Sequence, residues 1–442
     1  RNPRPVRRPL TPGRFPLRLR HSRLRRLPAR PAASSSGDLP TDALYEVLLL
    51  LPAKELCRLR TVCPAWRALT SDPLFVAAHK SRHRTALPLL AMGYRDDSGV
   101  SGVAISDLSG NVLKKIPGTE YELVFVNESG DAIGRFTSKD DSICVVRTRL
   151  DLVCFNRNAL CGFFWVLNPA TGATIDLPMD FSEEIAHELE VKGIKECSCR
   201  RELCAFGQVS SSREYKVLRI SRVDDRKVCE VITFDDTNHG SWRRKQDPPS
   251  HICTSHRMRY AVVDGVVYFL MEFCYSNYET GVITTEPGSV ASFNLDTEEW
   301  MGVLRGPEQL ERFLQENGGY TYSGLGREVS LAELNGCLVV VHNIYKISMD
   351  LWFLTDFENG IWVKKYSLPS HVARLFWYPF LMLDDGRIFL SGMDCLEGIL
   401  SGGEQGEGFL LCYDPRNGTC TNELKLRDPR SIGIYTGSLL SL

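Results

Sequence analysis

The stretch Phe164-Trp165-Val166-Leu167-Asn168-Pro169-Ala170-Thr171-Gly172 joins an apolar run to a turn that opens at an Asn. Asn and Asp favour turns because their side chains bond to the backbone two residues further on. An Asp or Asn opens a comparable turn at six places: Asp107, Asn168, Asp235, Asn294, Asp356 and Asp414. The intervals between them are 61, 67, 59, 62 and 58 residues, so a unit of nearly constant length repeats along the chain.

Strand pairs precede these turns. Asp264-Gly265, Asn335-Gly336 and Asp385-Gly386 each lie between two runs rich in β-branched and aromatic residues. Asp-Gly or Asn-Gly in that setting is the strongest short signal for a β-hairpin. Each turn is followed by a recurring position, filled by tryptophan in three units, and then by a proline. These residues are Trp242, Trp300 and Trp362, with Thr174 and Cys420 in the matching places, and Pro117, Pro178, Pro248, Pro307, Pro369 and Pro429.

Hairpins at this period are typical of propeller blades. The six units predict a mainly β chain with a six-bladed β-propeller over residues 87–442. The first unit is about half as long as the others, and the β-prone segment 431–440 has no unit of its own. We therefore predict that this last segment completes the first blade, which removes two exposed strand edges. Short helices are expected in two insertions, at 183–191 and 308–314.

A helical pattern precedes the repeat. Leu44, Val47, Leu48 and Leu51 fall at i, i+3, i+4 and i+7, one stripe of a helix that Thr41 could cap and Pro52 ends. Two further short helices are expected, and Pro64 suits the first turn of the third. A piece of about 40 residues is too small to bury so much apolar surface by itself. The surplus surface therefore needs either a partner protein or the rest of this chain.

The string from Leu39-Pro40 through Val62-Cys63 and Trp66-Arg67 to Asp72-Pro73-Leu74-Phe75 resembles an F-box. The repeat resembles the kelch-like propeller of plant F-box-associated domains, above all at 164–172 and Leu177-Pro178. The resemblance implies a disordered arm over 1–37, a small three-helix F-box over 38–80, a linker over 81–86 and the propeller over 87–442. It also implies binding to a Skp-family adaptor through Leu39, Pro40, Leu44, Val47, Leu48, Leu51, Pro52, Leu56, Leu59, Val62, Cys63 and Trp66.

The function implied by the resemblance is substrate recognition in an SCF-type cullin-RING ubiquitin ligase. The adaptor would connect the chain to cullin and RING subunits, and the propeller would bind an unknown protein substrate. Tyr320, Tyr322, Phe376, Trp377 and Tyr378 are candidate contact aromatics, although each could equally be a core residue. Two other classes stay open: a propeller enzyme, such as a hydrolase or an oxidase, and an interaction scaffold that works without a ligase. No cofactor and no catalytic residue is expected, and the cytoplasm or nucleus is the expected compartment.

Charge and composition limit which partners and locations are possible for the chain. Residues 1–37 hold eleven Arg and no Lys, Asp or Glu, so the formal net charge of −1 for the whole chain becomes −12 for residues 38–442. This balance argues against a nucleic-acid partner for the folded part. The Arg- and Pro-rich arm cannot build a core, although its composition also suits an organelle transit peptide. The first Met is Met92, so the natural start is expected upstream of Arg1, or the arm reflects a misread frame. No apolar run reaches the ~18 residues that a membrane helix needs.

The 15 cysteines are odd in number and spread through strand-like runs, as in a reducing compartment. Two local clusters could suggest zinc: Cys197, Cys199 and Cys204, and His251, Cys253 and His256. Neither cluster has the second half-site that structural zinc sites pair with the first. We therefore expect no metal.

Overall fold

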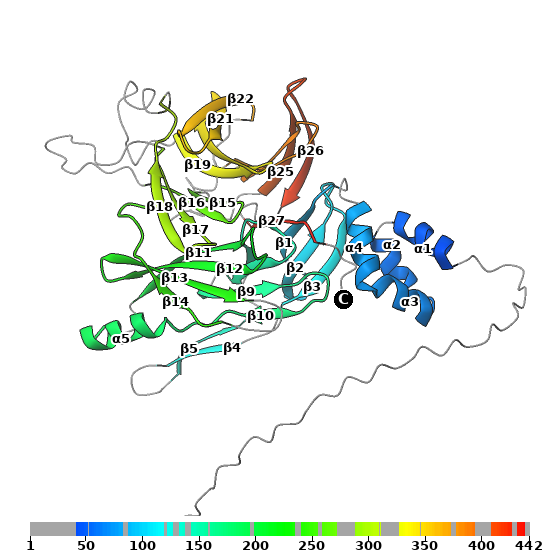
Figure 1. Ribbon diagram of the computed structural model, residues 1–442, viewed down its shortest axis with the longest axis horizontal. Helices are drawn as coiled ribbons and strands as arrows, with labels where there is room; N and C mark the ends of the chain where they lie inside the picture. Colours follow the sequence, from blue (N-terminus) through cyan, green and yellow to red (C-terminus); the bar gives the residue numbers. More distant parts are fainter. Residues whose placement is uncertain are drawn as a thin grey trace, which may run out of the picture. The chain divides into compact units, whose positions relative to one another are not determined.

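The computed structural model describes residues 41–51, 53–82, 87–118, 122–126, 132–137, 143–157, 160–194, 199–234, 240–254, 259–271, 288–308, 310, 327–344, 346–372, 377–393, 408–426 and 431–437. Helices occupy the first part of these residues and β-strands most of the remainder (Figure 1).

The helical module has four helices where three were expected: α1 (Thr41–Leu50), α2 (Ala53–Leu59), α3 (Pro64–Ser71) and α4 (Pro73–Arg82). The fourth begins at Asp72, whose Oδ1 accepts the backbone N–H groups of Leu74 (2.8 Å) and Phe75 (3.3 Å). An Asp at the cap followed by a Pro at the first helical position is a standard helix start. The Asp72-Pro73 pair therefore starts a fourth helix and does not end the module.

Polar bonds tie the short helices together. The Sγ of Cys63 accepts the Trp66 N–H (3.5 Å), and Pro64 fills the first turn of α3 as predicted. Arg60, just after α2, donates to the carbonyl of the buried Thr70 at 2.7 Å. The buried His79 on α4 lies 2.8 Å from the Leu51 carbonyl through its Nε2. These bonds fix the chain direction at each helix junction.

Six antiparallel sheets form the blades of a six-bladed β-propeller, as predicted. The first strands of consecutive blades contact one another, β11 with β15, β15 with β19 and β19 with β23, which places them at the propeller axis. Blade 1 contains β1 (Leu89–Arg95), β2 (Ser101–Ser106), β3 (Val112–Pro117) and β27 (Ile432–Tyr435). Blade 2 contains β6 (Ile143–Val145), β8 (Val153–Arg157), β9 (Leu160–Leu167) and β10 (Thr174–Asp176). Blade 3 contains β11 (Arg200–Gln208), β12 (Tyr215–Val223), β13 (Arg226–Phe234) and β14 (Arg243–Lys245).

Blade 4 contains β15 (Tyr260–Val263), β16 (Val266–Leu270), β17 (Val290–Asn294) and β18 (Glu299–Leu304). Blade 5 contains β19 (Arg327–Leu334), β20 (Cys337–Ile344), β21 (Ser348–Asp356) and β22 (Ile361–Pro369). Blade 6 contains β23 (Tyr378–Met382), β24 (Ile388–Met393), β25 (Gly408–Asp414) and β26 (Thr419–Leu426). A separate pair, β4 (Glu122–Val126) and β5 (Ala132–Thr137), lies between blades 1 and 2 in sequence. The helix predicted at 183–191 is present as α5 (Glu183–Lys192), whereas the one predicted at 308–314 lies mostly outside the described residues.

The last strand closes the ring. β27 pairs antiparallel with β1, with Leu89 opposite Tyr435 and Met92 opposite Ile432. Its other edge pairs in parallel with the two-residue β7 (Arg149–Leu150). Ser431 adds a bond through its Oγ, which accepts the Val145 N–H of blade 2 at 2.6 Å. The predicted completion of the first blade by the C-terminal segment is therefore confirmed.

The core lies between the blades. Each of six buried apolar clusters joins two neighbouring blades, and together they link blade 1 to 2 and so on around to blade 6 and back to blade 1. Side chains alternate along each strand, so a single strand serves two clusters. On β20, Val339 and Val341 join the cluster shared with blade 6, whereas Leu338 and Val340 join the one shared with blade 4.

Five of the six predicted turns lie between the two outermost strands of their blades, as between β2 and β3 in blade 1, and the sixth, at Asp235, lies outside the described residues. Side-chain oxygens cap the turns, as when Asn168 Oδ1 accepts the Ala170 N–H (3.0 Å) and Asp414 Oδ1 the Arg416 N–H (3.0 Å). The first hairpins also match: Asp264 and Gly265 have φ values of 47° and 77°, as a type I′ turn requires.

The recurring tryptophans bond to the preceding blade. Each indole Nε1 donates to a carbonyl just beyond the outermost strand of that blade: Trp242 to Pro178 (2.7 Å), Trp300 to Gln246 (2.9 Å) and Trp362 to Arg305 (2.8 Å). The repeat in the sequence therefore corresponds to a repeated link between blades 2 and 3, 3 and 4, and 4 and 5. Buried or half-buried indoles normally find such a hydrogen-bond acceptor.

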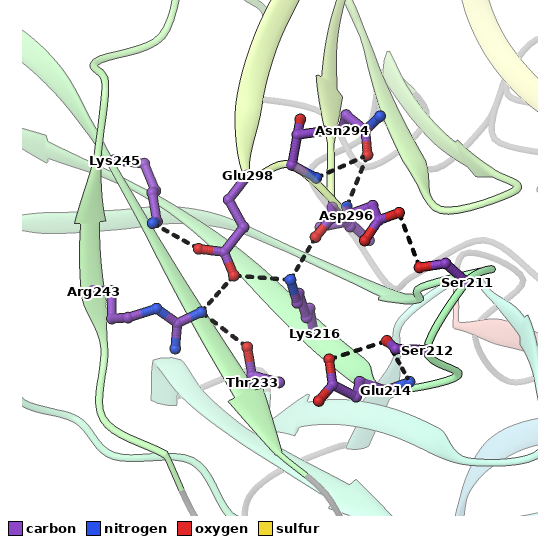
Figure 2. A network of polar contacts seen from close by, with 12 residues as sticks. Ser211, Ser212, Glu214, Lys216, Thr233, Arg243, Lys245, Asn294, Asp296 and Glu298 are labelled. Carbon is purple, nitrogen blue, oxygen red and sulfur yellow. Dashed lines mark hydrogen bonds and ion pairs between the residues drawn. The ribbon is translucent and has the colours of Figure 1, made fainter.

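A second link between blades 3 and 4 is ionic (Figure 2). The Glu298 carboxylate forms ion pairs with three cations of blade 3: Lys216 Nζ (2.9 Å), Arg243 Nη2 (2.5 Å) and Lys245 Nζ (2.6 Å). Lys216 also donates to the Leu295 carbonyl at 2.7 Å. Burial alone would raise the pKa of Glu298, but hydrogen bonds from these three cations lower it from 4.5 to about 2.

Acid should weaken the ionic link between Glu298 and blade 3. Because the pKa of Glu298 is lower in the folded than in the unfolded chain, its contribution to stability is present above about pH 4.5 and is lost as the pH falls toward about 2. We expect Glu298→Gln to reduce the difference between the melting temperatures at pH 7 and pH 3. The exposed neighbour Glu299, as Glu299→Gln, is the control. Equal pH dependence in both variants would contradict the assignment.

Candidate adaptor-binding and substrate-binding surfaces

The predicted adaptor-binding residues fall into four groups. Val47 and Val62 are exposed, at 47% and 62%. Leu44, Leu51, Leu59, Cys63 and Trp66 are half-buried. Leu48 and Leu56 are buried, at 1% and 0%. Leu39, Pro40 and Pro52 lie outside the described residues.

Leu48 and Leu56 differ from Val47 and Val62 in being buried, and their part in adaptor binding stays a prediction. Periodicity placed both on the apolar stripes that we expected to face a partner, but the structure places them in the interior. Two exposed apolar residues were not among those predicted: Leu50 at 59% and Leu74 at 78%. Large apolar side chains that remain in solvent in a module this small indicate a surface for a partner.

A cavity opens at the end of the propeller where the first hairpins of blades 3, 4 and 5 lie. Its volume is about 340 Å³, and β7, the end of β11 and the turns at Asp264-Gly265 and Gly336 line it. This volume lies within the ordinary range for ligand pockets. Two cations, Arg149 and Arg213, and two carboxylates, Asp264 and Glu333, stand around it. The mixed charges suit a polar ligand with both donors and acceptors.

Glu333 is the carboxyl at this cavity that burial affects most clearly. Burial raises the pKa of its carboxyl, against a hydrogen bond from the Gly336 N–H (2.6 Å) and the nearby Arg149 guanidinium (3.6 Å). Arg213 has a left-handed φ of 62° and an exposed side chain, and within the described residues no carboxylate pairs with it. Arg213 is therefore available to a ligand at the cavity mouth.

The two candidate contact aromatics that the structure describes do not line this cavity. Trp377 and Tyr378 are buried, at 1% and 7%, and Trp377 belongs to the cluster between blades 5 and 6. Tyr320, Tyr322 and Phe376 lie outside the described residues. The two that can be placed are core residues.

The cysteines that can be placed behave as small apolar side chains. Burial raises the pKa of Cys204 to about 12 and raises that of Cys154, so both thiols stay protonated at neutral pH. A thiol nucleophile needs the opposite shift. Within the described part of the chain, no three His, Cys, Asp or Glu side chains gather as metal ligands. Cys197 and His256 lie outside it, so neither suggested zinc cluster is tested. None of the described helices is long and apolar enough to cross a bilayer.

A helical docking module joined to a six-bladed propeller defines a class of binding proteins, and comparisons with known proteins identify which one. Residues 132–422, more than half of the chain, match the F-box associated beta propeller domain, and residues 37–77 match the F-box domain. The chain therefore belongs to the plant-type F-box proteins with an F-box associated propeller.

A curated relative supports this assignment over most of the chain. An F-box/kelch-repeat protein of Arabidopsis thaliana is 25% identical over 361 residues, which are 80% of this chain and 85% of the relative. Solved propellers align only loosely. A six-bladed Aleuria aurantia lectin has a TM-score of 0.34 at 10% identity, covering 75% of this chain and 89% of the lectin. The tricorn protease has a TM-score of 0.29 at 11% identity, covering 77% of this chain and 39% of that chain. At this similarity neither bears on what the chain binds.

Proposed function

We propose that this chain is the substrate-recognition subunit of an SCF-type cullin-RING ubiquitin ligase. The F-box would bind a Skp-family adaptor, and through it the cullin and RING subunits, while the propeller would bind a protein substrate. The observation that carries the proposal is the F-box match at 37–77 in a module that exposes Val47, Leu50, Val62 and Leu74, followed by an F-box associated propeller.

The mechanism is positional. The chain supplies no reacting group; it holds a substrate at a fixed distance from the ubiquitin-loaded enzyme bound elsewhere in the complex. Tethering raises the effective concentration of the substrate lysine near the ubiquitin thioester, so transfer becomes effectively intramolecular. The cavity bordered by Arg149, Arg213, Asp264 and Glu333 is the proposed contact for a polar segment of the substrate.

Two other functions compete with this one. A propeller hydrolase or oxidase would need activated groups, whereas the buried thiols Cys154 and Cys204 are held protonated. A scaffold that works without a ligase would keep the propeller and not bind the adaptor. Co-purification of the full chain with a Skp-family adaptor and cullin separates the ligase subunit from the two other functions, because only the ligase subunit retains both.

Val62→Glu should weaken adaptor binding by about 100-fold. Val62 is 62% exposed, so a charge there leaves the free chain folded. In an apolar interface the unpaired carboxylate costs about 3 kcal/mol, or two factors of ten in affinity. Affinity is measured by calorimetry or surface plasmon resonance with purified adaptor. Leu48 would be a poor choice for this test, because its burial confuses lost binding with lost folding.

Ile347→Glu provides the matched control. Ile347 is an equally exposed apolar residue, at 67%, in the turn between β20 and β21 of the propeller, and it should leave adaptor affinity unchanged. If Val62→Glu binds the adaptor as tightly as the control does, Val62 is not part of the interface. If the wild-type chain binds no Skp-family adaptor at all, the proposed function is wrong.

A further inference from the structure

One half-buried arginine of the propeller has no counter-charge among the described residues. Arg147 follows β6, the inner strand of blade 2, and its guanidinium Nη2 donates to Ser391 Oγ of blade 6 at 3.4 Å. The phenols of Tyr378 in blade 6 and Tyr260 in blade 4 are near enough to influence its pKa. Neighbours from two other blades, 4 and 6, place the guanidinium of this blade 2 residue at the propeller axis, where the inner strands converge.

The partners of Arg147 are incomplete. Its Nε and Nη1 are buried with no hydrogen-bond acceptor among the described residues, and the single bond to Ser391 is long. No described carboxylate forms an ion pair with it. Burial lowers its pKa to about 10, so the group still carries its positive charge at neutral pH. A buried charge without a counter-charge is strongly unfavourable and calls for a compensating group.

Arg219 is an arginine of the same propeller whose guanidinium has both a carboxylate partner and carbonyl acceptors. This arginine is 1% exposed and bonds the Glu230 carboxylate through Nε (3.0 Å) and Nη2 (2.8 Å). Its Nη2 also donates to the Asp180 carbonyl at 2.8 Å. Arg147 is only half-buried, but its Nε and Nη1 are shielded from solvent and no carboxylate of the described residues bonds to them. The contrast isolates Arg147 as a cation whose negative partner is not supplied by the described residues.

We propose that Arg147 is the centre of an oxyanion-binding site in the propeller channel, which takes a phosphate or carboxylate group. The guanidinium offers a planar set of N–H donors that matches such groups, and the Ser391 hydroxyl, 3.4 Å from its Nη2, is a neutral group beside it. The next two residues, Thr148 and Arg149, line the cavity at the channel mouth, which gives an anion a polar approach. This site is independent of the adaptor-binding role.

Thermal melting of the full chain tests the site, with inorganic phosphate against chloride at constant ionic strength. Phosphate at about 100 times its dissociation constant should raise the melting temperature of the wild type by about 3–5 °C. Arg147→Met should abolish this rise. Without phosphate, the same variant should melt at or above the wild-type temperature, because it removes an unpaired buried charge.

Arg416→Met is the matched control, since Arg416 is an exposed arginine in the outer turn of blade 6, does not line the cavity, and should not affect the response. Citrate in place of phosphate distinguishes a carboxylate from a phosphate ligand, and Arg147→Lys, which keeps the charge but not the planar donors, should weaken either anion about tenfold. Direct calorimetric titration of phosphate or citrate into the wild type, expected to show one site per chain, keeps the test valid if a variant fails to fold.

Three results would overturn the proposal. The first is a wild type that neither anion stabilises. The second is an equal rise in Arg147→Met, or a rise lost in Arg416→Met instead, because the anion would then bind elsewhere. The third is a large anion-independent loss of stability in Arg147→Met, which would show that protein groups already compensate the charge.

Discussion

Removal of residues 431–442 is expected to leave the propeller insoluble. The deletion takes away β27, whose Ile432, Ile434 and Tyr435 are buried at 1%, 5% and 2% and belong to the two core clusters that join blade 1 to its neighbours. Losing each large buried side chain costs about 2–5 kcal/mol, so the sum reaches the about 5–15 kcal/mol by which whole domains are stable. The exposed edge of β1 would also invite pairing between molecules.

Two control deletions distinguish the loss of ring closure from a general effect of shortening the chain. Removing only 438–442 keeps β27 and should preserve soluble yield and the melting temperature. Removing 1–37 should do the same, since that arm is without apolar periodicity. If the chain that lacks 431–442 is soluble and melts like the wild type, ring closure does not stabilise this propeller.

Glu230→Leu should destabilise the propeller by about 3–5 kcal/mol. Glu230 is 0% exposed and holds Arg219, which is 1% exposed, in a bond of 2.8 Å. Its other oxygen accepts the Ser182 N–H at 2.7 Å, which anchors the segment before α5. Without the carboxylate the guanidinium is left buried and unpaired, which is the costly half of such a pair. Urea denaturation monitored by tryptophan fluorescence measures the loss.

The double variant Arg219→Met with Glu230→Leu provides the control. It removes both charges and should recover most of the stability that the single variant loses, because a buried ion pair is often no more stabilising than apolar residues of similar volume. A single variant within about 1 kcal/mol of the wild type would mean that water reaches Arg219 and replaces the lost carboxylate.

The repeat in the sequence was sufficient to predict the blades because the signals are local. Asn168, Asn294 and Asp414 open their turns through bonds to residues two positions away, and Asp264-Gly265 sets its hairpin through backbone angles alone. The closing role of 431–440 was also predictable, since it followed from counting strands. The fourth helix was within reach too, because Asp72 and Pro73 form a local start signal.

The buried charges were not predictable, because their environment comes from distant parts of the chain. Arg147 bonds to a residue 244 positions away, and nothing near it in sequence separates it from the ion-paired Arg219. Which of the adaptor-binding candidates are buried could not be predicted, for a related reason. Helical periodicity identifies an apolar stripe but not which of its members face inward, so Leu48 and Val62 looked alike although one is buried and the other is exposed.

The pairing of β1 with β27 also has a consequence for biosynthesis. The two strands end at Arg95 and Tyr435, so 340 residues must be translated between them. At about 5–20 residues per second, the ribosome needs about 17–70 s for that distance. Throughout this interval the nascent chain carries a strand edge whose partner has not been made, while the F-box ahead of it has already left the exit tunnel. Chaperone occupancy on ribosome-bound chains should therefore persist until the last strand emerges.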